Sequence, residues 1–168
     1  MKTLLVLRHA KSAYPEGVGD HERPLADRGE RDAAAAARWL HEHGLRPDLV
    51  LCSTATRTRQ TWEHLVSHFV APGPEVRFDA RVYEASASRL ATLLRETDPA
   101  VSSVLLIGHN PGCEDLVLAL CDHGDSGALS AVQTKYPTTG LAVMDLDGDW
   151  SALAAGKASL RRFVVPRG

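Results

Sequence analysis

The apolar residues of this chain gather in short continuous runs separated by longer segments of periodic character. The run at 2–7 is typical of a strand buried on both faces of a sheet, and the runs at 49–52 and 103–107 share that character. Runs at 141–146 and 160–165 predict two closing strands. All of them are far shorter than the roughly 20 apolar residues that cross a membrane as a helix. The pattern therefore predicts buried strands and no membrane-spanning segment.

Between these runs, apolar positions recur every three or four residues, which predicts helices packed on a sheet. The first helix is expected to be capped by Asp27 and to stop at Gly44. The second is expected to follow a cap at Ser53 or Thr54 and to continue until Pro72. Their inward faces would consist of Ala33, Ala36, Ala37 and Leu40 in the first helix and of Trp62, Leu65, Val66 and Phe69 in the second.

The middle of the chain continues the alternation. A short strand is expected at 76–78 and a third helix over 88–96. A fourth helix is expected after Asn110 as cap and Pro111 in its first turn. The polar stretch 122–139 predicts a loop.

The two closing strands are expected to be joined by a hairpin turn at 147–149. Strands that alternate with helices in this way favour a parallel arrangement with helices on both faces. The sequence therefore predicts an α/β fold, a single three-layer α/β/α domain over residues 1–168 with a mostly parallel central sheet.

Composition and charge narrow the function classes. With 44% hydrophobic and 24% charged side chains among 168 residues, the chain has the make-up of one domain with its own core. A formal net charge of −2 predicts no general attraction to nucleic acid or to a membrane surface, so an anion site would have to be local. The first strand follows Met1 directly and leaves no room for a signal peptide, so we expect a cytoplasmic protein. Reduced, buried thiols are expected at Cys52, Cys113 and Cys121.

Two histidines and two arginines fall directly after predicted strands. Arg8 and His9 follow the first strand, Arg57 opens the helix after the second, and His109 follows the strand at 103–107. Because ligands of open α/β sheets bind beyond the carboxyl ends of the strands, these side chains are expected to share one edge. Guanidinium groups suit the equatorial oxygens of a transferring phosphoryl group, and a neutral imidazole can attack phosphorus. We therefore predict a phosphoryl site with His9 as nucleophile and His109 as a stabilising donor.

These residues also resemble the histidine phosphatase superfamily, and within it the small bacterial SixA-type phosphohistidine phosphatases. The motifs occur in order: R-H-A at 8–10, R-P-L-x-x-x-G at 23–29, S-x-x-x-R-x-x-Q-T at 53–61, Tyr83-Glu84, and G-H-N-P at 108–111. The resemblance extends from Leu5 to about Cys121, and residues 122–168 match in strand character alone.

The resemblance implies a phosphoglycerate mutase-like fold and a covalent phosphohistidine intermediate on His9. It implies that Arg8, Arg57 and His109 bind the phosphoryl group and that Arg23 assists them. It also implies that the reaction needs no cofactor and no metal. The partner would be a phosphohistidine-bearing protein or a small phosphorylated substrate, with neither nucleic acid nor membrane involved.

Glu84 has two interpretations. It is expected either to act as a general acid or base in catalysis, or to be a solvated side chain on the surface. Two departures from the wider superfamily are visible: Ala10 replaces the usual glycine, and Pro15 stands where mutase-like members carry a phosphate-binding asparagine. The second departure argues against mutase activity.

Two further functions are compatible with the sequence. One is a small-molecule phosphomonoesterase for sugar or nucleotide phosphates, and the other is a non-catalytic module that binds phosphate or a phosphopeptide. The pairing of His9 with His109 argues against the module, because binding alone does not require two imidazoles.

Overall fold

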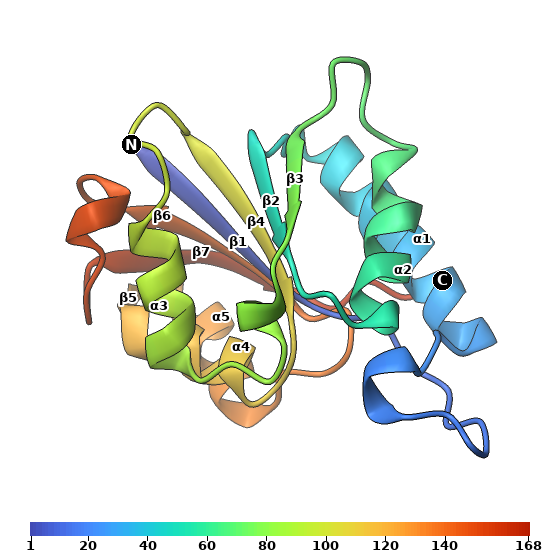
Figure 1. Ribbon diagram of the computed structural model, residues 1–168. Helices are drawn as coiled ribbons and strands as arrows, with labels where there is room; N and C mark the ends of the chain where they lie inside the picture. Colours follow the sequence, from blue (N-terminus) through green and yellow to red (C-terminus); the bar gives the residue numbers. More distant parts are fainter.

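Seven strands form one sheet in the computed structural model, which describes residues 1–168 (Figure 1). The strands are β1 (Lys2–Arg8), β2 (Leu49–Cys52), β3 (Glu75–Phe78), β4 (Ser103–Gly108), β5 (Cys121–Gly124), β6 (Leu141–Leu146) and β7 (Ala158–Val164). They lie in the order β3-β2-β4-β1-β6-β7-β5. The first four of these are parallel to one another, β6 is antiparallel to both of its neighbours, and β7 and β5 are parallel. The prediction of a mostly parallel α/β sheet is confirmed.

Helices cover both faces of this sheet. They are α1 (Asp27–Glu42), α2 (Thr56–Val66), α3 (Ala87–Arg95), α4 (Gly112–Leu120) and α5 (Ser126–Thr134), with short 3₁₀ turns η1 (Asp20–Glu22), η2 (Ala80–Val82) and η3 (Trp150–Ala152). Figure 1 shows α1 and α2 on one face and α3, α4 and α5 on the other, which confirms the three layers. The longest helix, α1, has 16 residues, and no helix reaches the length and apolarity that a bilayer crossing requires.

The pleat of β1 explains why both faces are covered. Leu4 and Val6 point into the core shared with α3, α4 and α5, whereas Leu5 and Leu7 point into the core shared with α1 and α2. All four are fully buried, as expected for a central strand in a parallel sheet. The stripe of small side chains on α1, including Ala36, lets that helix lie close to the sheet.

The predicted N-terminal caps of α1 and α2 are wrong, whereas α1 ends just before Gly44, as predicted. Ala26 precedes α1 without a side-chain cap, and Asp27 is already helical, where its charge favours the helix N-terminus. The Ala26 N–H bonds the carbonyl of Lys11, which fixes the entry of the chain into the helix. At α2 the cap position is Ala55, whose N–H donates to the Ser53 hydroxyl, and that hydroxyl also bonds a histidine described below.

The end of α2 also differs from the prediction. The helix stops at Val66 instead of Pro72, and the Ser67 hydroxyl donates to the carbonyl of His64 at this end. Val66, the last residue of the helix, is 42% exposed, although its spacing predicts an inward position. Phe69 lies beyond the helix and stacks on Trp62 with ring centroids 5.9 Å apart.

The polar stretch at 122–139 is not a plain loop. It contains the end of β5 and the whole of α5, whose buried residues are only Ala128 and Val132. Because β5 is an edge strand with three exposed residues, neither element carries a long apolar pattern. The local signal for α5 is Asp125, whose carboxylate accepts the N–H of Ala128 at 2.8 Å.

The connection between β6 and β7 is longer than the predicted hairpin turn at 147–149. It extends from Asp147 to Lys157 and includes η3. Trp150 holds this segment in place, since its side chain is fully buried and its indole N–H donates to the carbonyl of Val101 at 2.7 Å. Trp150 therefore fixes the longer connection against the rest of the fold.

The three cysteines are free and buried, as predicted. Burial disfavours the thiolate and raises the pKa values of Cys52, Cys113 and Cys121 to about 12.

Gly29 marks the closest approach between α1 and the segment after β1. A Cβ at this position would lie 1.9 Å from the carbonyl oxygen of Lys11. We expect Gly29→Ala to lower the free energy of unfolding by about 1–3 kcal/mol, because the helix or the Lys11 backbone must move. Denaturant unfolding measures this, with Gly73→Ala as the control, since a Cβ at Gly73 meets nothing within 4 Å. Equal stability of the two variants would contradict the packing argument.

Candidate active site

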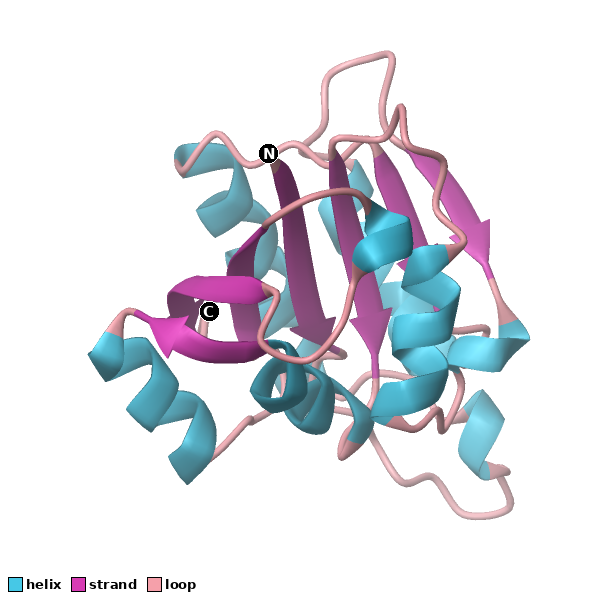
Figure 2. Ribbon diagram, turned by 90° about the vertical axis from the view of Figure 1, so that its left-hand side faces the viewer, coloured by secondary structure: helices cyan, strands magenta, loops and turns pink.

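The carboxyl ends of three parallel strands bring the predicted site residues together. In the pairing of β1 with β4, Arg8 lies opposite Gly108, and the His9 N–H donates to the Gly108 carbonyl at 3.0 Å. His9 and His109 therefore leave neighbouring strands side by side, with ring centroids 5.3 Å apart. Figure 2 shows several strand arrows pointing toward one end of the sheet, where loops gather.

A cavity of about 170 Å³ opens at this end of the sheet. Its lining residues are Arg8, His9, Lys11, Ser12, Tyr14, Arg23, Arg57, His109, Asn110 and Thr138. Five of the six predicted site residues thus share one cavity, and the exception is Glu84. The lining is dominated by cationic and polar side chains, which suits an anion.

Three buried donor atoms in this cavity's lining have no hydrogen-bond partner: Arg8 Nε, Arg57 Nε and His109 Nδ1. Leaving a buried donor unsatisfied costs about 1–3 kcal/mol, so folded proteins rarely tolerate several together. Burial lowers the pKa of Arg8 from its ordinary value, yet its guanidinium stays cationic, because an arginine is protonated at every physiological pH. An oxyanion in the cavity would supply the acceptors that these groups lack.

The His9 imidazole is held in one tautomer. Its Nδ1–H donates to the carbonyl of Ala10 at 2.7 Å, which leaves the lone pair on Nε2. Burial lowers the pKa of His9 to about 3, and the nearby His109, Arg57 and Arg8 add to this effect. The side chain is 6% exposed. His9 is therefore neutral at physiological pH and offers an unshared electron pair.

His109 is oriented by a buried serine. Its Nε2 lies 2.8 Å from the Ser53 hydroxyl, which already accepts the Ala55 N–H. Because Ser53 is fully buried and its hydroxyl has no other acceptor, we assign its proton to the bond with Nε2 and the ring proton of His109 to Nδ1. Burial, followed by the charge of Arg57, lowers the pKa of His109 to about 3. His109 is thus a neutral donor with a free N–H.

Asp20, which the sequence analysis missed, connects several of these groups. Its carboxylate accepts from Arg57 Nη2 at 3.2 Å, from Arg23 Nε at 3.1 Å and from the Tyr83 hydroxyl. Its main-chain carbonyl accepts from Arg57 Nη1 at 2.7 Å. The Tyr83 hydrogen bond and the two guanidinium groups hold the pKa of Asp20 well below its usual range. In the sequence, the indication that Asp20 pairs with an arginine is its position three residues before Arg23.

Arg23 lines the cavity, but its guanidinium donates hydrogen bonds to the loop after β1. Besides Asp20, it donates to the Ser12 hydroxyl at 2.7 Å and to the Ala13 carbonyl at 3.2 Å. Its side chain is 12% exposed. Arg23 therefore fixes the shape of the wall that contains Ser12 and Ala13.

Glu84 lies outside this cavity. It is exposed, its backbone adopts the left-handed conformation with φ of 53°, and it lines an adjoining cavity of about 410 Å³. His109 and Asn110 line both cavities, so the two are neighbours. Glu84 is consequently placed near the site without touching the cationic groups.

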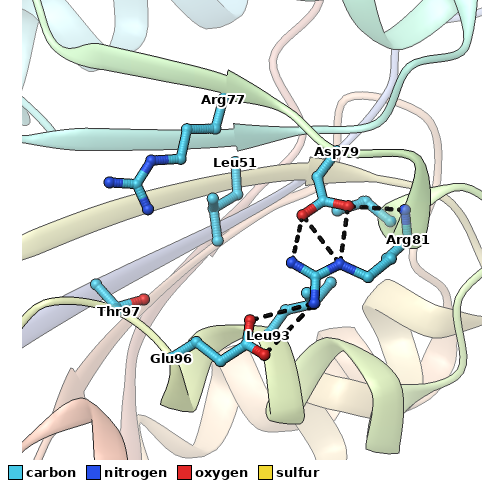
Figure 3. A pocket seen from close by; sticks show the side chains of 8 residues that line it. Leu51, Arg77, Asp79, Arg81, Leu93, Glu96 and Thr97 are labelled. Atoms are coloured by element: carbon cyan, nitrogen blue, oxygen red, sulfur yellow. Dashed lines mark hydrogen bonds and ion pairs between the residues drawn. The ribbon is translucent and has the colours of Figure 1, made fainter.

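Another polar cavity, between β3 and α3, contains an arginine that, unlike Arg8, is paired with carboxylates of the protein (Figure 3). Arg81 lies there with its guanidinium bonded to Asp79 at 2.8 Å and to Glu96 at 3.3 Å. The carboxylates of the protein itself satisfy this cation. No comparable demand for an external anion exists at Arg81.

Comparison with known proteins shows the family to which this chain belongs. A model of the histidine phosphatase superfamily (branch 1) matches residues 4–103. An uncharacterized protein of Mycobacterium tuberculosis is 40% identical over 163 residues, which is 96% of this chain and 100% of that relative.

Solved structures agree in fold. One from Nakamurella multipartitia, provisionally assigned as the phosphohistidine phosphatase SixA, superimposes with a TM-score of 0.86 at 30% identity and covers 98% of this chain and 96% of that one. Another provisional SixA, from Agrobacterium tumefaciens, gives 0.83 at 31% identity over 98% of both chains. The chain belongs to branch 1 of the histidine phosphatase superfamily and resembles its SixA proteins.

Proposed function

We propose that this protein is a phosphatase that removes the phosphoryl group from phosphohistidine on a protein, through a covalent intermediate on His9. The observation that carries the proposal is the set of three unpaired buried donors, Arg8 Nε, Arg57 Nε and His109 Nδ1, in the cavity that also holds the neutral His9. Such donors are suited to an oxyanion whose charge grows during the reaction.

In the first half-reaction the lone pair on His9 Nε2 attacks phosphorus. The bond from phosphorus to the substrate nitrogen breaks, its electron pair stays on that nitrogen, and the leaving imidazole takes up a proton from solvent. The Ala10 carbonyl stabilises the positive charge that His9 acquires, because it accepts the Nδ1 proton. Arg8, Arg57 and His109 bind the phosphoryl oxygens throughout.

In the second half-reaction water attacks the phosphorus of phosphorylated His9. The bond from phosphorus to Nε2 breaks, the electron pair returns to the ring, and the protons of the water pass to the released phosphate and to solvent. His9 is restored in its original tautomer because Nδ1 has kept its bond to Ala10 throughout.

Phosphohistidine as the substrate is supported by two observations. The similar structures from Nakamurella multipartitia and Agrobacterium tumefaciens carry that provisional assignment. Glu84, the acid expected from the sequence, lies in the neighbouring cavity and makes no hydrogen bond, and imidazole needs less protonation to leave than an alkoxide does.

A small phosphomonoester is the second candidate substrate. The observation that favours it is the same neighbouring cavity, since Glu84 shares its lining with His109 and could protonate an alcohol that leaves on that side.

The covalent intermediate can be trapped. A labelled phosphohistidine donor is mixed with the protein, and the reaction is quenched within one turnover. We expect label on His9 with the acid lability and alkali stability of a phosphoramidate. His9→Ala should carry no label and should lose turnover by at least about 10³-fold, because the nucleophile is absent. Wild-type turnover in His9→Ala would overturn the mechanism.

A Glu84 variant tests whether this side chain protonates an alcohol leaving group and is dispensable for an imidazole leaving group. In Glu84→Gln we expect hydrolysis of an alkyl phosphate to fall by about 10²-fold, the usual contribution of a general acid, while hydrolysis of phosphohistidine changes by less than about threefold. Steady-state kcat/KM on both substrates measures this. An equal loss on both would show that Glu84 acts on a step common to the two reactions.

The neutral state of the two imidazoles predicts a pH dependence of stability. The pKa values of His9 and His109 are lowered to about 3, so the unfolded chain binds protons below about pH 6.5 that the folded chain does not bind. The free energy of unfolding should therefore decrease as pH falls from 7 toward 4.5 in denaturant titrations. The double variant His9→Gln, His109→Gln is the control and should show a shallower decrease. An unchanged slope would mean that these histidines are not buried as neutral groups.

A further inference from the structure

An exposed aromatic ring stands at the mouth of the phosphoryl cavity. Tyr14 lines the cavity and yet is 75% exposed, which is unusual for an aromatic side chain. The function proposed above assigns no role to this ring.

One face of the Tyr14 ring packs against an arginine. The Arg23 guanidinium lies over it, with Cζ 4.1 Å from the ring centroid, close enough for a cation–π contact. Arg23 itself is fixed by its bonds to Ser12, Ala13 and Asp20, and its side chain is nearly buried.

The backbone next to Tyr14 is also held. Ser12 forms an isolated antiparallel bridge with Leu25, and the Ala13 N–H donates to the Pro24 carbonyl at 2.8 Å. Pro15 follows the tyrosine and disfavours the α conformation of the Tyr14 backbone, which keeps it extended. One face of the ring thus rests on a fixed cation. The Lys11 ammonium lies 5.9 Å from the ring centroid, and the residue stays 75% exposed beside the phosphoryl cavity.

We propose that Tyr14 determines specificity by stacking on a planar, aromatic leaving group. This inference rests on the proposed function and extends it from the phosphoryl group to the group that carries it. The imidazole of phosphohistidine and the phenol ring of phosphotyrosine share the required chemistry, whereas the aliphatic carbon of phosphoserine does not. A ring that is held in advance loses little conformational freedom when it stacks.

One peptide sequence carrying phosphohistidine, phosphotyrosine or phosphoserine at the same position tests this. In Tyr14→Ala we expect kcat/KM for the planar substrate to fall about tenfold, the order of one stacking contact, and for the phosphoserine peptide to change by less than about twofold. Tyr14→Phe keeps the ring and should retain wild-type values within about twofold. Of the phosphohistidine and phosphotyrosine peptides, the one whose kcat/KM falls more in Tyr14→Ala carries the leaving group that stacks better on Tyr14.

Two controls isolate the ring from the phosphoryl site. Inhibition by inorganic phosphate should be the same in Tyr14→Ala as in the wild type, because stacking does not involve the phosphoryl oxygens. Val18→Ala, in the same loop but outside the cavity lining, should leave all three rates unchanged.

Different outcomes would disprove the stacking role of Tyr14 and the phosphatase activity on which it rests. Equal losses on planar and aliphatic substrates, weakened phosphate inhibition, or a Tyr14→Phe variant as poor as Tyr14→Ala would overturn the stacking role and leave the phosphatase intact. A wild-type protein that releases no phosphate from the phosphohistidine peptide would overturn the proposed function, and one that releases none from either planar substrate would overturn this inference with it.

Discussion

The parallel pairing of β1 with β4 is the constraint on which the rest of the site depends. Its register sets Arg8 beside Gly108, and so the two strands end side by side and carry His9 and His109 to a ring-centroid distance of 5.3 Å. A shift by one residue would turn every side chain of β1 to the opposite face and exchange its two cores. The apolar alternation along β1 therefore fixes the geometry of the two imidazoles as well as the fold.

The site also balances charge. Two buried or half-buried guanidinium groups need counter-charge when no substrate is bound, and Asp20 supplies it to Arg57 from a short 3₁₀ turn. Its hydrogen bonds go to Nη1 and Nη2 of Arg57, while Nε stays free. A carboxylate that satisfied every donor, as Asp79 and Glu96 do for Arg81, would leave nothing to bind an oxyanion.

Much of this arrangement was predictable from sequence, because buried strands and the residues that follow them obey simple rules. The gathering of Arg8, His9, Arg57 and His109 follows from parallel strands that end at one edge. The fold class and the inward face of α1 follow from apolar spacing, and the motif resemblance pointed to the same family.

The remaining features depend on contacts between distant segments, which no local pattern encodes. Asp20 meets Tyr83 across 63 positions of sequence, and Ser53 meets His109 across 56, so a serine expected to cap a helix sets a tautomer instead. The elements β5 and α5 were missed because an edge strand and a partly exposed helix bury few residues. The left-handed backbone of Glu84, which places it in the neighbouring cavity, also has no signature in its side-chain type.

The three buried cysteines have a consequence for how this protein meets oxidants. Peroxide attacks the thiolate form of cysteine, and thiols whose pKa values burial raises to about 12 stay almost entirely protonated at pH 7. Their sulfur atoms are enclosed in the cores, and none of the three cysteines lines the cavity that holds His9. Phosphoryl chemistry that relies on an imidazole, in a chain whose thiols are this inert, would continue under oxidative stress that silences phosphatases with a cysteine nucleophile.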